Sequence, residues 1–373
     1  MQIPARASYA EIDLAAFRWN FKQMQNHVKP AAIGAVVKAN AYGHGMEKIA
    51  REAVKLGVYC LCVGFAQTGL ELRELGFDVP ILVMIPALYN EIEQAIHENL
   101  ELSAYSLEDA QEISAAARRL DKKAVIHIFI DTGMHRAGLL WEGAAEEIKK
   151  IHELPGIRIK GIYTHFASAD WSDLTFTYKQ LDRFKSVLSE LPFAVPVIHT
   201  ANSAAILQVK GSLFTMVRPG LSLYGYYPSM QCKRPFLLRP VMSLKSYVAD
   251  VQTYKAHESI GYSLTYTIPE QTNIAAVPIG YGDGVNRLFS NNGSVLIRGK
   301  RFPIIGRVSM DWILADIGSE TNIQPGDEVV LMGKQGNNKI SIYEWCETLQ
   351  TIPYEVTCNI SSRVPRKFIN TSE

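Results

Sequence analysis

The sequence has few cysteines, and none of them shows the spacing that cysteine-based sites use. Its five cysteines are an odd number and include no CxxC pair. Neither a disulfide framework nor a zinc knuckle is therefore predicted. We expect no structural metal, and a reducing compartment such as the cytoplasm fits this composition best.

An excess of charge of one sign is also lacking. The chain has 38 Lys and Arg against 37 Asp and Glu, for a formal net charge of +1 at pH 7. Proteins that bind nucleic acids or membrane surfaces through phosphate groups usually carry clustered basic residues. The balance argues against both kinds of partner and favours a small-molecule ligand.

Long apolar runs are missing as well. No stretch approaches the roughly 18 uncharged apolar residues that a membrane span needs. The start, MQIPARASYAEIDLAAF, lacks the basic segment and apolar core of a targeting leader. As given, the chain is expected to be soluble and untargeted, although it would read the same if a membrane segment had been removed upstream.

What the sequence does contain is enough apolar material for two domains. It has 373 residues, of which 47% are hydrophobic. Up to about residue 225, short apolar runs alternate with helical patterns, as in repeated βα units. Eight parallel strands with outer helices close most simply into a TIM-type barrel; a doubly wound sheet has the same local pattern, but the length favours the barrel. The candidate strands are Ile33–Val37, Tyr59–Val63, Ile81–Ile85, Glu101–Ala104, Ala124–Ile130, Ile159–Thr164, Val195–Thr200 and Thr215–Arg218.

The pattern changes after Pro240, where helical periodicity largely stops. Short strands separated by Gly, Pro, Asn and Asp predict a mostly-β domain, interrupted by one helix over Ser341–Leu349. Ser341 as N-cap and Glu344 three residues later form a capping box at the start of that helix. The candidate strands are Ser243–Val251, Asn273–Ile279, Ser294–Ile297, Ile313–Ile317 and Glu328–Met332.

Prolines between residues 228 and 242 interrupt periodicity and mark the boundary between the two patterns. We therefore predict a (β/α)8 barrel domain over residues 1–237. The β-strand-rich C-terminal domain is predicted over residues 238–373.

One lysine lies where a barrel places its chemistry. The segment VVKANAYGHG, Val36–Gly45, runs from an apolar strand directly into Lys38 and then into a Gly-containing turn. In a barrel the C-terminal ends of the strands carry the active site. On position alone, a lysine more often simply marks the end of a buried strand.

The surrounding residues decide between these two interpretations. VVKANAYGHG resembles the cofactor-binding segment of the alanine racemases, whose lysine holds pyridoxal 5′-phosphate as a Schiff base. Nine further ordered matches extend the resemblance over nearly the whole chain. They are AEIDL, DTGMHRAG, THFASAD, HTANSAA, VRPGLSLYG, IGYSLTY, PIGYGDG, GRVSMDW and YEVTCNISSRVPR.

The resemblance implies a racemase that uses two bases. Racemising an amino acid removes the α-proton from one face and returns a proton to the other, so two opposed acid/base groups are needed. The cofactor is the electron sink. By resemblance Lys38 serves the face from which D-alanine loses its proton. Tyr262 serves the other face, in the active site of the opposite subunit, so a homodimer is implied.

Further roles follow from the same resemblance. His165 and Arg218 match the histidine and arginine that link the tyrosine to the pyridine nitrogen of the cofactor. Because an arginine cannot accept a proton, that nitrogen is expected to stay unprotonated. The residues assigned to the phosphate are Tyr42, Ser203, Gly220, Leu221 and Tyr354.

Two residues are assigned to the substrate, and one departure from the family concerns the first of them. Arg136 is expected near the substrate carboxylate, and Met310, beside Asp311, is expected to reach the active site of the partner. Many alanine racemases carry a carbamylated lysine that orients the arginine, but this chain has Phe129 there. Arg136 therefore needs another partner, such as a chloride or a water, or it is held more loosely.

Several alternatives stay open at this level. The bulk of Tyr354 suits a methyl side chain, which favours alanine and a role in supplying D-alanine for peptidoglycan. A serine racemase of glycopeptide-resistance systems shares the architecture, and a small pocket discriminates poorly against one added hydroxyl. Amino-acid decarboxylases of this plan usually pair the pyridine nitrogen with an acidic residue, so Arg218 speaks against them. Single-barrel proteins that bind the same cofactor lack a domain like the one after Pro240.

Overall fold

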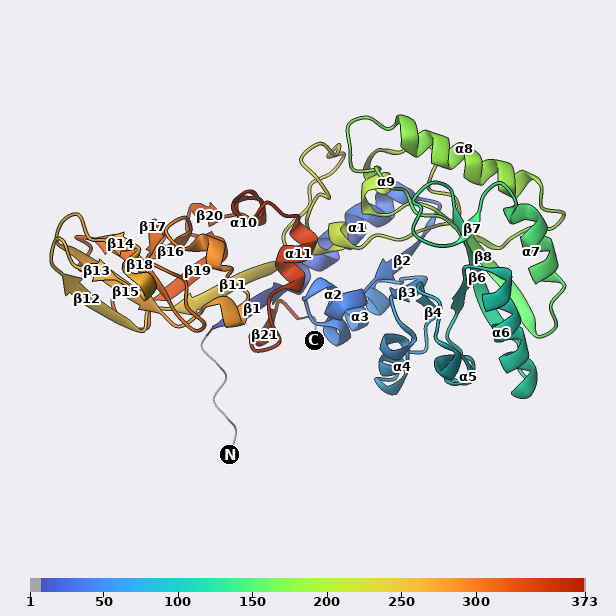
Figure 1. Ribbon diagram of the computed structural model, residues 1–373, viewed down its shortest axis with the longest axis horizontal. Helices are drawn as coiled ribbons and strands as arrows, with labels where there is room; N and C mark the ends of the chain where they lie inside the picture. The colour runs from blue at the N-terminus through green and yellow to red at the C-terminus, as the bar shows by residue number, and fades with distance from the viewer. Residues whose placement is uncertain (1–7, 372–373) are drawn as a thin grey trace. The chain divides into compact units, whose positions relative to one another are not determined.

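The structure is a computed structural model that describes residues 8–371 (Figure 1). The chain divides into two compact units. The first, the barrel unit, comprises Phe17–Ala41 and Met46–Arg239. The second, the β unit, comprises residues 8–16, Tyr42–Gly45 and 240–371. No helix of these described residues is long and apolar enough to cross a membrane.

The barrel unit contains eight parallel strands that close on themselves. Neighbouring strands pair in the order β10, β2, β3, β4 and β5, β6, β8, β9. A bridge between Leu82 and Glu101 joins β4 to β5, and the Thr215 N–H donates to the Ile198 carbonyl between β10 and β9. The strands are β2 (Ala32–Val36), β3 (Cys60–Val63), β4 (Ile81–Val83), β5 (Leu102–Ala104), β6 (Ala124–Asp131), β8 (Ile157–Tyr163), β9 (Val197–His199) and β10 (Met216–Val217). The predicted TIM-type barrel is confirmed.

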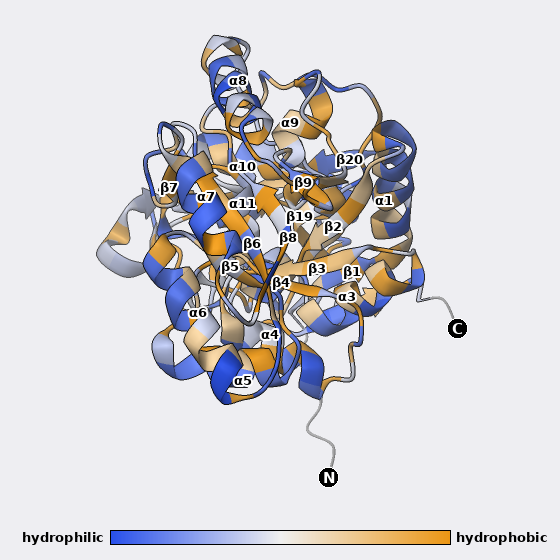
Figure 2. Cartoon of the chain, turned by 90° about the vertical axis from the view of Figure 1, so that its right-hand side faces the viewer, coloured by the Kyte–Doolittle hydropathy of each residue, from blue (hydrophilic) through white to orange (hydrophobic). Residues whose placement is uncertain are grey.

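Helices surround these strands, and all but the fully buried α9 turn one apolar stripe toward the sheet. In Figure 2 the barrel strands are largely hydrophobic, whereas helices such as α6 carry hydrophilic and hydrophobic residues on different faces. Ser106 caps α6 by accepting the Asp109 N–H at 3.0 Å. The helices are α1 (Leu14–Val28), α3 (Met46–Lys55), α4 (Ala66–Glu74), α5 (Tyr89–His97), α6 (Leu107–Arg119), α7 (Ala144–His152), α8 (Thr175–Ser189) and α9 (Ser203–Gln208).

The β unit is built on one ten-stranded sheet, in which β20 (Asn338–Ile340) lies off the main path. The path runs β12, β15, β18, β17, β16, β19, β11, β1, β21. In chain order these are β1 (Tyr9–Asp13), β11 (Met242–Tyr247), β12 (Asp250–Tyr254), β15 (Thr272–Val277), β16 (Ser294–Ile297), β17 (Lys300–Ile305), β18 (Ile313–Gly318), β19 (Glu328–Gln335) and β21 (Arg366–Ile369). A two-stranded ribbon, β13 (Ser259–Ile260) and β14 (Tyr266–Thr267), stands beside them.

Two helices complete the β unit, α10 (Ile342–Leu349) and α11 (Pro353–Cys358). The predicted capping box of α10 is present. Ser341 accepts the Glu344 N–H, and the Glu344 carboxylate accepts the Ser341 N–H at 2.7 Å. The mostly-β character predicted for the C-terminal part is thus confirmed.

Some local predictions differ from the structure. The run predicted as one strand, Ser243–Val251, forms most of β11 and the first two residues of β12, and Val248 and Ala249 between them belong to neither strand. The division of the chain also differs from a simple split at residue 237. Strand β1 pairs with β11 and β21, so the first described residues belong to the β unit.

Candidate active site

Five of the predicted site residues follow the C-terminal ends of barrel strands. Lys38 comes after β2, Arg136 after β6, His165 after β8, Ser203 after β9 and Arg218 after β10. Because all of these strands are parallel and the barrel is closed, these ends share one mouth. The barrel unit thus gathers them at the end of the fold where active sites form.

The lysine begins a backbone turn of unusual hand. Ala39, Asn40, Ala41 and Tyr42 all have φ between 51° and 53°, which makes a short left-handed helical turn directly after Lys38. Each non-glycine residue in this conformation costs roughly 1–2 kcal/mol. The Asn40 side chain supports the turn by accepting the Met46 N–H at 2.7 Å, at the start of α3. Strain that is held in this way is typical of functional sites.

Arg218 is buried, and its two terminal nitrogens are fully used inside the barrel. Nη1 donates to Nδ1 and to the carbonyl of His199, both at 2.7 Å. Nη2 donates to the Thr164 carbonyl at 2.8 Å and to the Thr200 carbonyl at 3.4 Å. The remaining N–H, on Nε, has no acceptor among residues 8–371, so the guanidinium is held rigidly with one donor left to offer.

His165 is kept neutral by its surroundings. Burial lowers its pKa to about 3, and the nearby charges of Arg218, Arg136 and Lys38 act in the same direction. Its interaction with Arg218 places these two predicted residues close together. A neutral imidazole beside a guanidinium can pass a hydrogen bond onward without adding a second positive charge.

The predicted phosphate ligands of the barrel unit also contact one another. Ser203 is buried, and its hydroxyl oxygen accepts the Gly220 N–H at 3.0 Å and the Ser222 N–H at 3.2 Å. The hydroxyl proton of Ser203 is therefore the donor that this cluster can turn toward a ligand. Leu221 follows Gly220 and begins a short 3-10 helix over Leu221–Tyr224.

Arg136 has lost the support that the family lysine would give. Phe129, which replaces that lysine, is 2% exposed and packs against the rings of Tyr105 and Tyr163, each with its centroid 4.8 Å from that of Phe129. Arg136 is exposed and makes no hydrogen bond or ion pair with any residue from 8 to 371.

The remaining predicted residues lie in the β unit. Tyr262 is 72% exposed and starts a loop in which Ser263 and Leu264 have positive φ. Met310 is 51% exposed. Tyr42 and Tyr354, the two predicted phosphate tyrosines, have ring centroids 5.9 Å apart.

The glycines of PIGYGDG hold the loop that presents Met310. The Tyr281 N–H donates to the Ser309 carbonyl at 2.9 Å, and the Gly282 N–H donates to the Met310 carbonyl at 3.0 Å. A Cβ at Gly280 would overlap the Ser309 carbonyl oxygen. The glycine-rich motif is therefore required by close backbone approach to this loop.

Three polar residues of the barrel interior were not predicted as site residues. His199, His127 and Glu101 form a hydrogen-bonded series that begins at Arg218. Two features of the sequence could have indicated them: Glu101 is a charged residue at the start of an apolar strand, and His127 lies on the same strand face as Phe129.

Comparisons with known proteins identify the family. A model of the alanine racemase N-terminal domain matches residues 12–228, and a model of the alanine racemase C-terminal domain matches residues 241–368. The chain belongs to the alanine racemase family. An alanine racemase of Methanococcus maripaludis is 43% identical over 368 residues, which cover 97% of this chain and 98% of that protein.

Solved alanine racemases have the same fold. The alanine racemase of Clostridium difficile matches with a TM-score of 0.94 at 36% identity, covering 100% of this chain and 97% of that chain. The alanine racemase of Bartonella henselae, whose structure is described with covalently bound pyridoxal phosphate, matches with a TM-score of 0.88 at 29% identity, covering 97% and 99% of the two chains. The resemblance inferred from the sequence motifs is confirmed.

The barrel residues fit the cofactor of that relative. A buried guanidinium with one N–H lacking an acceptor suits an unprotonated ring nitrogen, which accepts one hydrogen bond. The Ser203 hydroxyl suits a phosphate oxygen. The donor set therefore matches the two ends of pyridoxal 5′-phosphate.

Proposed function

We propose that this protein is a pyridoxal-phosphate-dependent isomerase that interconverts L- and D-alanine. The observation that carries the proposal is the placement of Lys38, His165 and Arg218 after three strands of one barrel, in a chain of the alanine racemase family. The names of the relatives support alanine over serine as substrate.

In this proposal the barrel unit binds the cofactor. Lys38 attaches it covalently, the Arg218 Nε–H donates to the ring nitrogen, and Ser203 donates its hydroxyl proton to the phosphate. Gly220 and Leu221 complete the phosphate site of the barrel unit. When bound, pyridoxal 5′-phosphate supplies the electron sink that stabilises the negative charge left at Cα of the substrate.

Proton transfer is then the task of two side chains. The Lys38 amine takes or returns the α-proton on one face, and the Tyr262 phenol does so on the other. An unperturbed tyrosine has a pKa of about 10, so Tyr262 needs a positive or hydrogen-bonding neighbour to act near pH 7. In this proposal, neutral His165, polarised by Arg218, provides the hydrogen bond.

The exposure of Tyr262 supports a homodimer with shared active sites. A phenol that is 72% exposed cannot be an efficient base while it faces bulk water. Leu264, Met310 and Trp312 are exposed apolar residues of the same unit, at 64%, 51% and 45%. We propose that a second copy of the chain covers these residues and receives Tyr262 and Met310 into its own site, while Arg136 binds the substrate carboxylate.

Initial rates with L-alanine and L-serine, measured side by side on cofactor-loaded protein, test the proposal. Turnover of L-alanine is expected to be the faster. Lys38→Ala is expected to abolish both turnover and the visible absorbance band of the bound cofactor, whereas Lys48→Ala, an exposed lysine of α3, leaves both unchanged. Wild-type protein that gains no visible band when supplied with pyridoxal phosphate contradicts the proposal.

We further propose that the enzyme acts in the cytoplasm and supplies D-alanine for peptidoglycan. Expression in a bacterium that depends on external D-alanine should then remove that dependence. Continued dependence, with active enzyme present in the cells, would contradict this role.

A further inference from the structure

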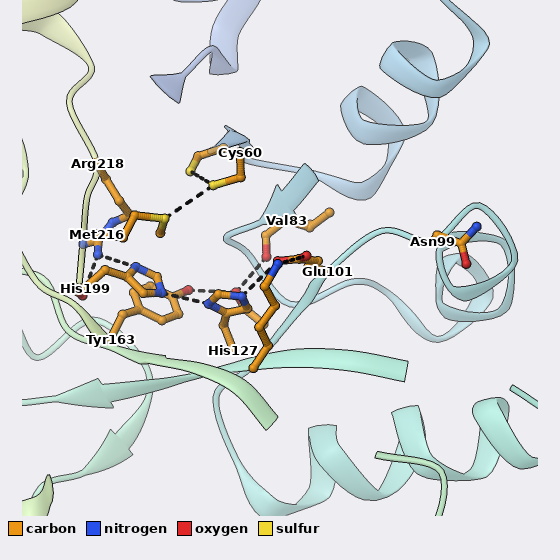
Figure 3. Close-up of polar contacts among 12 residues, drawn as sticks. Cys60, Val83, Asn99, Glu101, His127, Tyr163, His199, Met216 and Arg218 are labelled. Atoms are coloured by element: carbon orange, nitrogen blue, oxygen red, sulfur yellow. Dashed lines mark hydrogen bonds and ion pairs between the residues drawn. The ribbon is translucent and has the colours of Figure 1, made fainter. Parts of the chain in front are cut away.

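A continuous series of hydrogen bonds runs through the interior of the barrel below Arg218 (Figure 3). Arg218 Nη1 lies 2.7 Å from His199 Nδ1, and His199 Nε2 lies 2.8 Å from His127 Nδ1. His127 Nε2 lies 3.0 Å from Glu101 Oε2, and the other oxygen of Glu101 accepts from Lys160 Nζ. The series joins the ends of β10 and β9 to the start of β5.

The two ends of this series fix the direction of every bond. An arginine only donates, so His199 Nδ1 must be unprotonated and its proton lies on Nε2. That proton points at His127 Nδ1, which must also accept. His127 therefore carries its proton on Nε2 and donates it to the carboxylate of Glu101, which only accepts.

Both imidazoles are neutral, as this order requires. Burial lowers the pKa of His199 well below its usual value, and Arg218 acts in the same direction. Burial likewise lowers the pKa of His127, with Glu101 opposing and Lys160 and Arg218 adding to the effect. For Glu101, burial alone would raise the pKa, but His127 and Lys160 outweigh it and lower the pKa overall. The carboxylate is charged and the two rings are not.

The surrounding fold is built to hold the two rings. A Cβ at residue 161 would overlap Nδ1 of His127, so Gly161 makes the space for that imidazole. The ring of Tyr163 stacks on His199 with centroids 4.7 Å apart and an interplanar angle of 7°. The Tyr163 hydroxyl is itself within hydrogen-bond distance of Ser103 Oγ, at 2.8 Å. Neither imidazole is able to turn over without disturbing a buried neighbour.

We propose that Glu101 and His127 are positioning residues that act on Arg218 through His199. By holding both rings in the Nε2–H form, they keep His199 Nδ1 available as an acceptor, and this bond aims the guanidinium so that its Nε–H faces the barrel mouth. The identity of the group that the Nε–H contacts rests on the proposed function. The order of the hydrogen bonds does not depend on it.

Glu101→Gln tests this order of hydrogen bonds, because Lys160 and His127 both donate toward the side chain at position 101 and the new amide has only one oxygen to accept. Lys160 only donates, so it takes the amide oxygen and turns the NH₂ group toward His127. His127 must then accept at Nε2 and carry its own proton on Nδ1, where it points at His199 Nε2. His199 must in turn carry its proton on Nδ1, where it clashes with the N–H of Arg218. Lys160→Met removes the competitor, so in the double variant Glu101→Gln/Lys160→Met the amide oxygen can face His127 and restore the original order.

Nitrogen-15 spectra of the histidine rings report this order directly. We expect protonated Nε2 and bare Nδ1 on His127 and His199 in wild-type protein, a protonated Nδ1 on His127 in Glu101→Gln, and the wild-type pattern again in the double variant and in Lys160→Met alone. Expected kcat values follow the same pattern, with a fall of roughly 10- to 100-fold in Glu101→Gln and little change in KM.

A merely structural ion pair would give a different result. Lys160→Met would then lower kcat as much as Glu101→Gln does, and the double variant would not recover, which would overturn the inference. A protonated Nδ1 on either ring of wild-type protein would overturn it as well. Should Glu101→Gln fail to fold, Glu101→Asp, which keeps an acceptor-only group, must retain the wild-type ring pattern. Absence of racemase activity in wild-type protein would refute the proposed function alone, because the ring spectra decide the positioning role without it.

Discussion

Arg218 Nη1 donates to His199 Nδ1 across 2.7 Å inside a closed barrel, and this bond ties the predicted cofactor site to the interior of the fold. The guanidinium is fixed by four acceptors on neighbouring strand ends, three of them backbone carbonyls. Preorganised donors of this kind need no rearrangement during reaction.

Tyr262→Phe removes the phenol that is proposed to serve one face of the substrate. Racemisation should fall by at least about 100-fold, while the absorbance band of the bound cofactor persists. In D₂O the variant should still exchange the α-proton of D-alanine, because Lys38 serves that face. Tyr254→Phe, another exposed tyrosine of the β unit, is the control and should keep wild-type rates; racemisation undiminished in Tyr262→Phe would remove Tyr262 from the mechanism.

Three histidines of the barrel unit, each with a lowered pKa, predict how stability changes with pH. The pKa of His165 is about 3 in the folded protein and about 6.5 in an unfolded chain, so the unfolded state alone binds this proton between those values. The stability contributed by the neutral ring is complete above about pH 6.5 and is lost as the pH falls toward 3. His127 and His199, whose pKa values are also lowered, act in the same direction.

The urea concentration at the midpoint of unfolding should therefore decrease as the pH is lowered from 7.5 to 5. At pH 5, His165 accounts for up to about 2 kcal/mol of this loss. His165→Asn should flatten the pH dependence, and His257→Asn, which changes an exposed histidine of the β unit, should leave it as in wild-type protein. An equal slope in His165→Asn would show that this ring is protonated in the fold.

Gly161→Ala places a methyl group against the His127 imidazole. Because the position is packed, the substitution should lower the free energy of unfolding by about 1–3 kcal/mol or displace the ring. Gly143→Ala is the matched control, since a Cβ at Gly143 meets nothing within 4 Å. Thermal denaturation of the two variants measures the difference; equal melting temperatures would mean that His127 does not occupy the space at Gly161.

Because the turn after Lys38 is left-handed, a glycine substituted there is expected to stabilise the protein. Ala39 has a φ of 51° and is exposed, so Ala39→Gly relieves strain without removing packing. We expect the free energy of unfolding to rise by about 0.5–1 kcal/mol. Ala115→Gly, an exposed position inside the right-handed helix α6, should lower it by about 1 kcal/mol. Changes of the same sign in both variants would contradict the left-handed turn.

The sequence was sufficient to predict elements with a strong local signal. The α10 capping box and strand β16, Ser294–Ile297, lie where the pattern placed them. Strand β17, Lys300–Ile305, was missed because Lys300, Arg301 and Pro303 obscure the apolar alternation. The place of β1 in the ten-stranded sheet could not be predicted either, because its pairing with β11 and β21 spans more than 200 residues of chain and leaves no local signal.

The same contrast holds for the site: residues inside a local motif could be predicted, and residues that only the fold brings together could not. Short sequence motifs that match the family were sufficient to predict Lys38, Arg218 and Tyr262 as site residues. The series from His199 to Glu101 was not predicted, because its members come from three strands, β9, β6 and the start of β5, and meet only when the barrel closes. Likewise Phe129 signalled a missing lysine, but only the fold shows that its ring packs against two tyrosine rings.

Proton exchange at Cα of alanine in D₂O tests the central claim most directly. Cofactor-loaded wild-type protein is incubated separately with L-alanine and with D-alanine, and chirality and α-deuterium content are followed together. The account predicts that both samples converge on an equal mixture of the two enantiomers carrying deuterium at Cα. Lys38→Ala should abolish this conversion, and Tyr262→Phe should slow it at least about 100-fold while it still exchanges the α-proton of D-alanine. Retention of both starting configurations without deuterium uptake would contradict it.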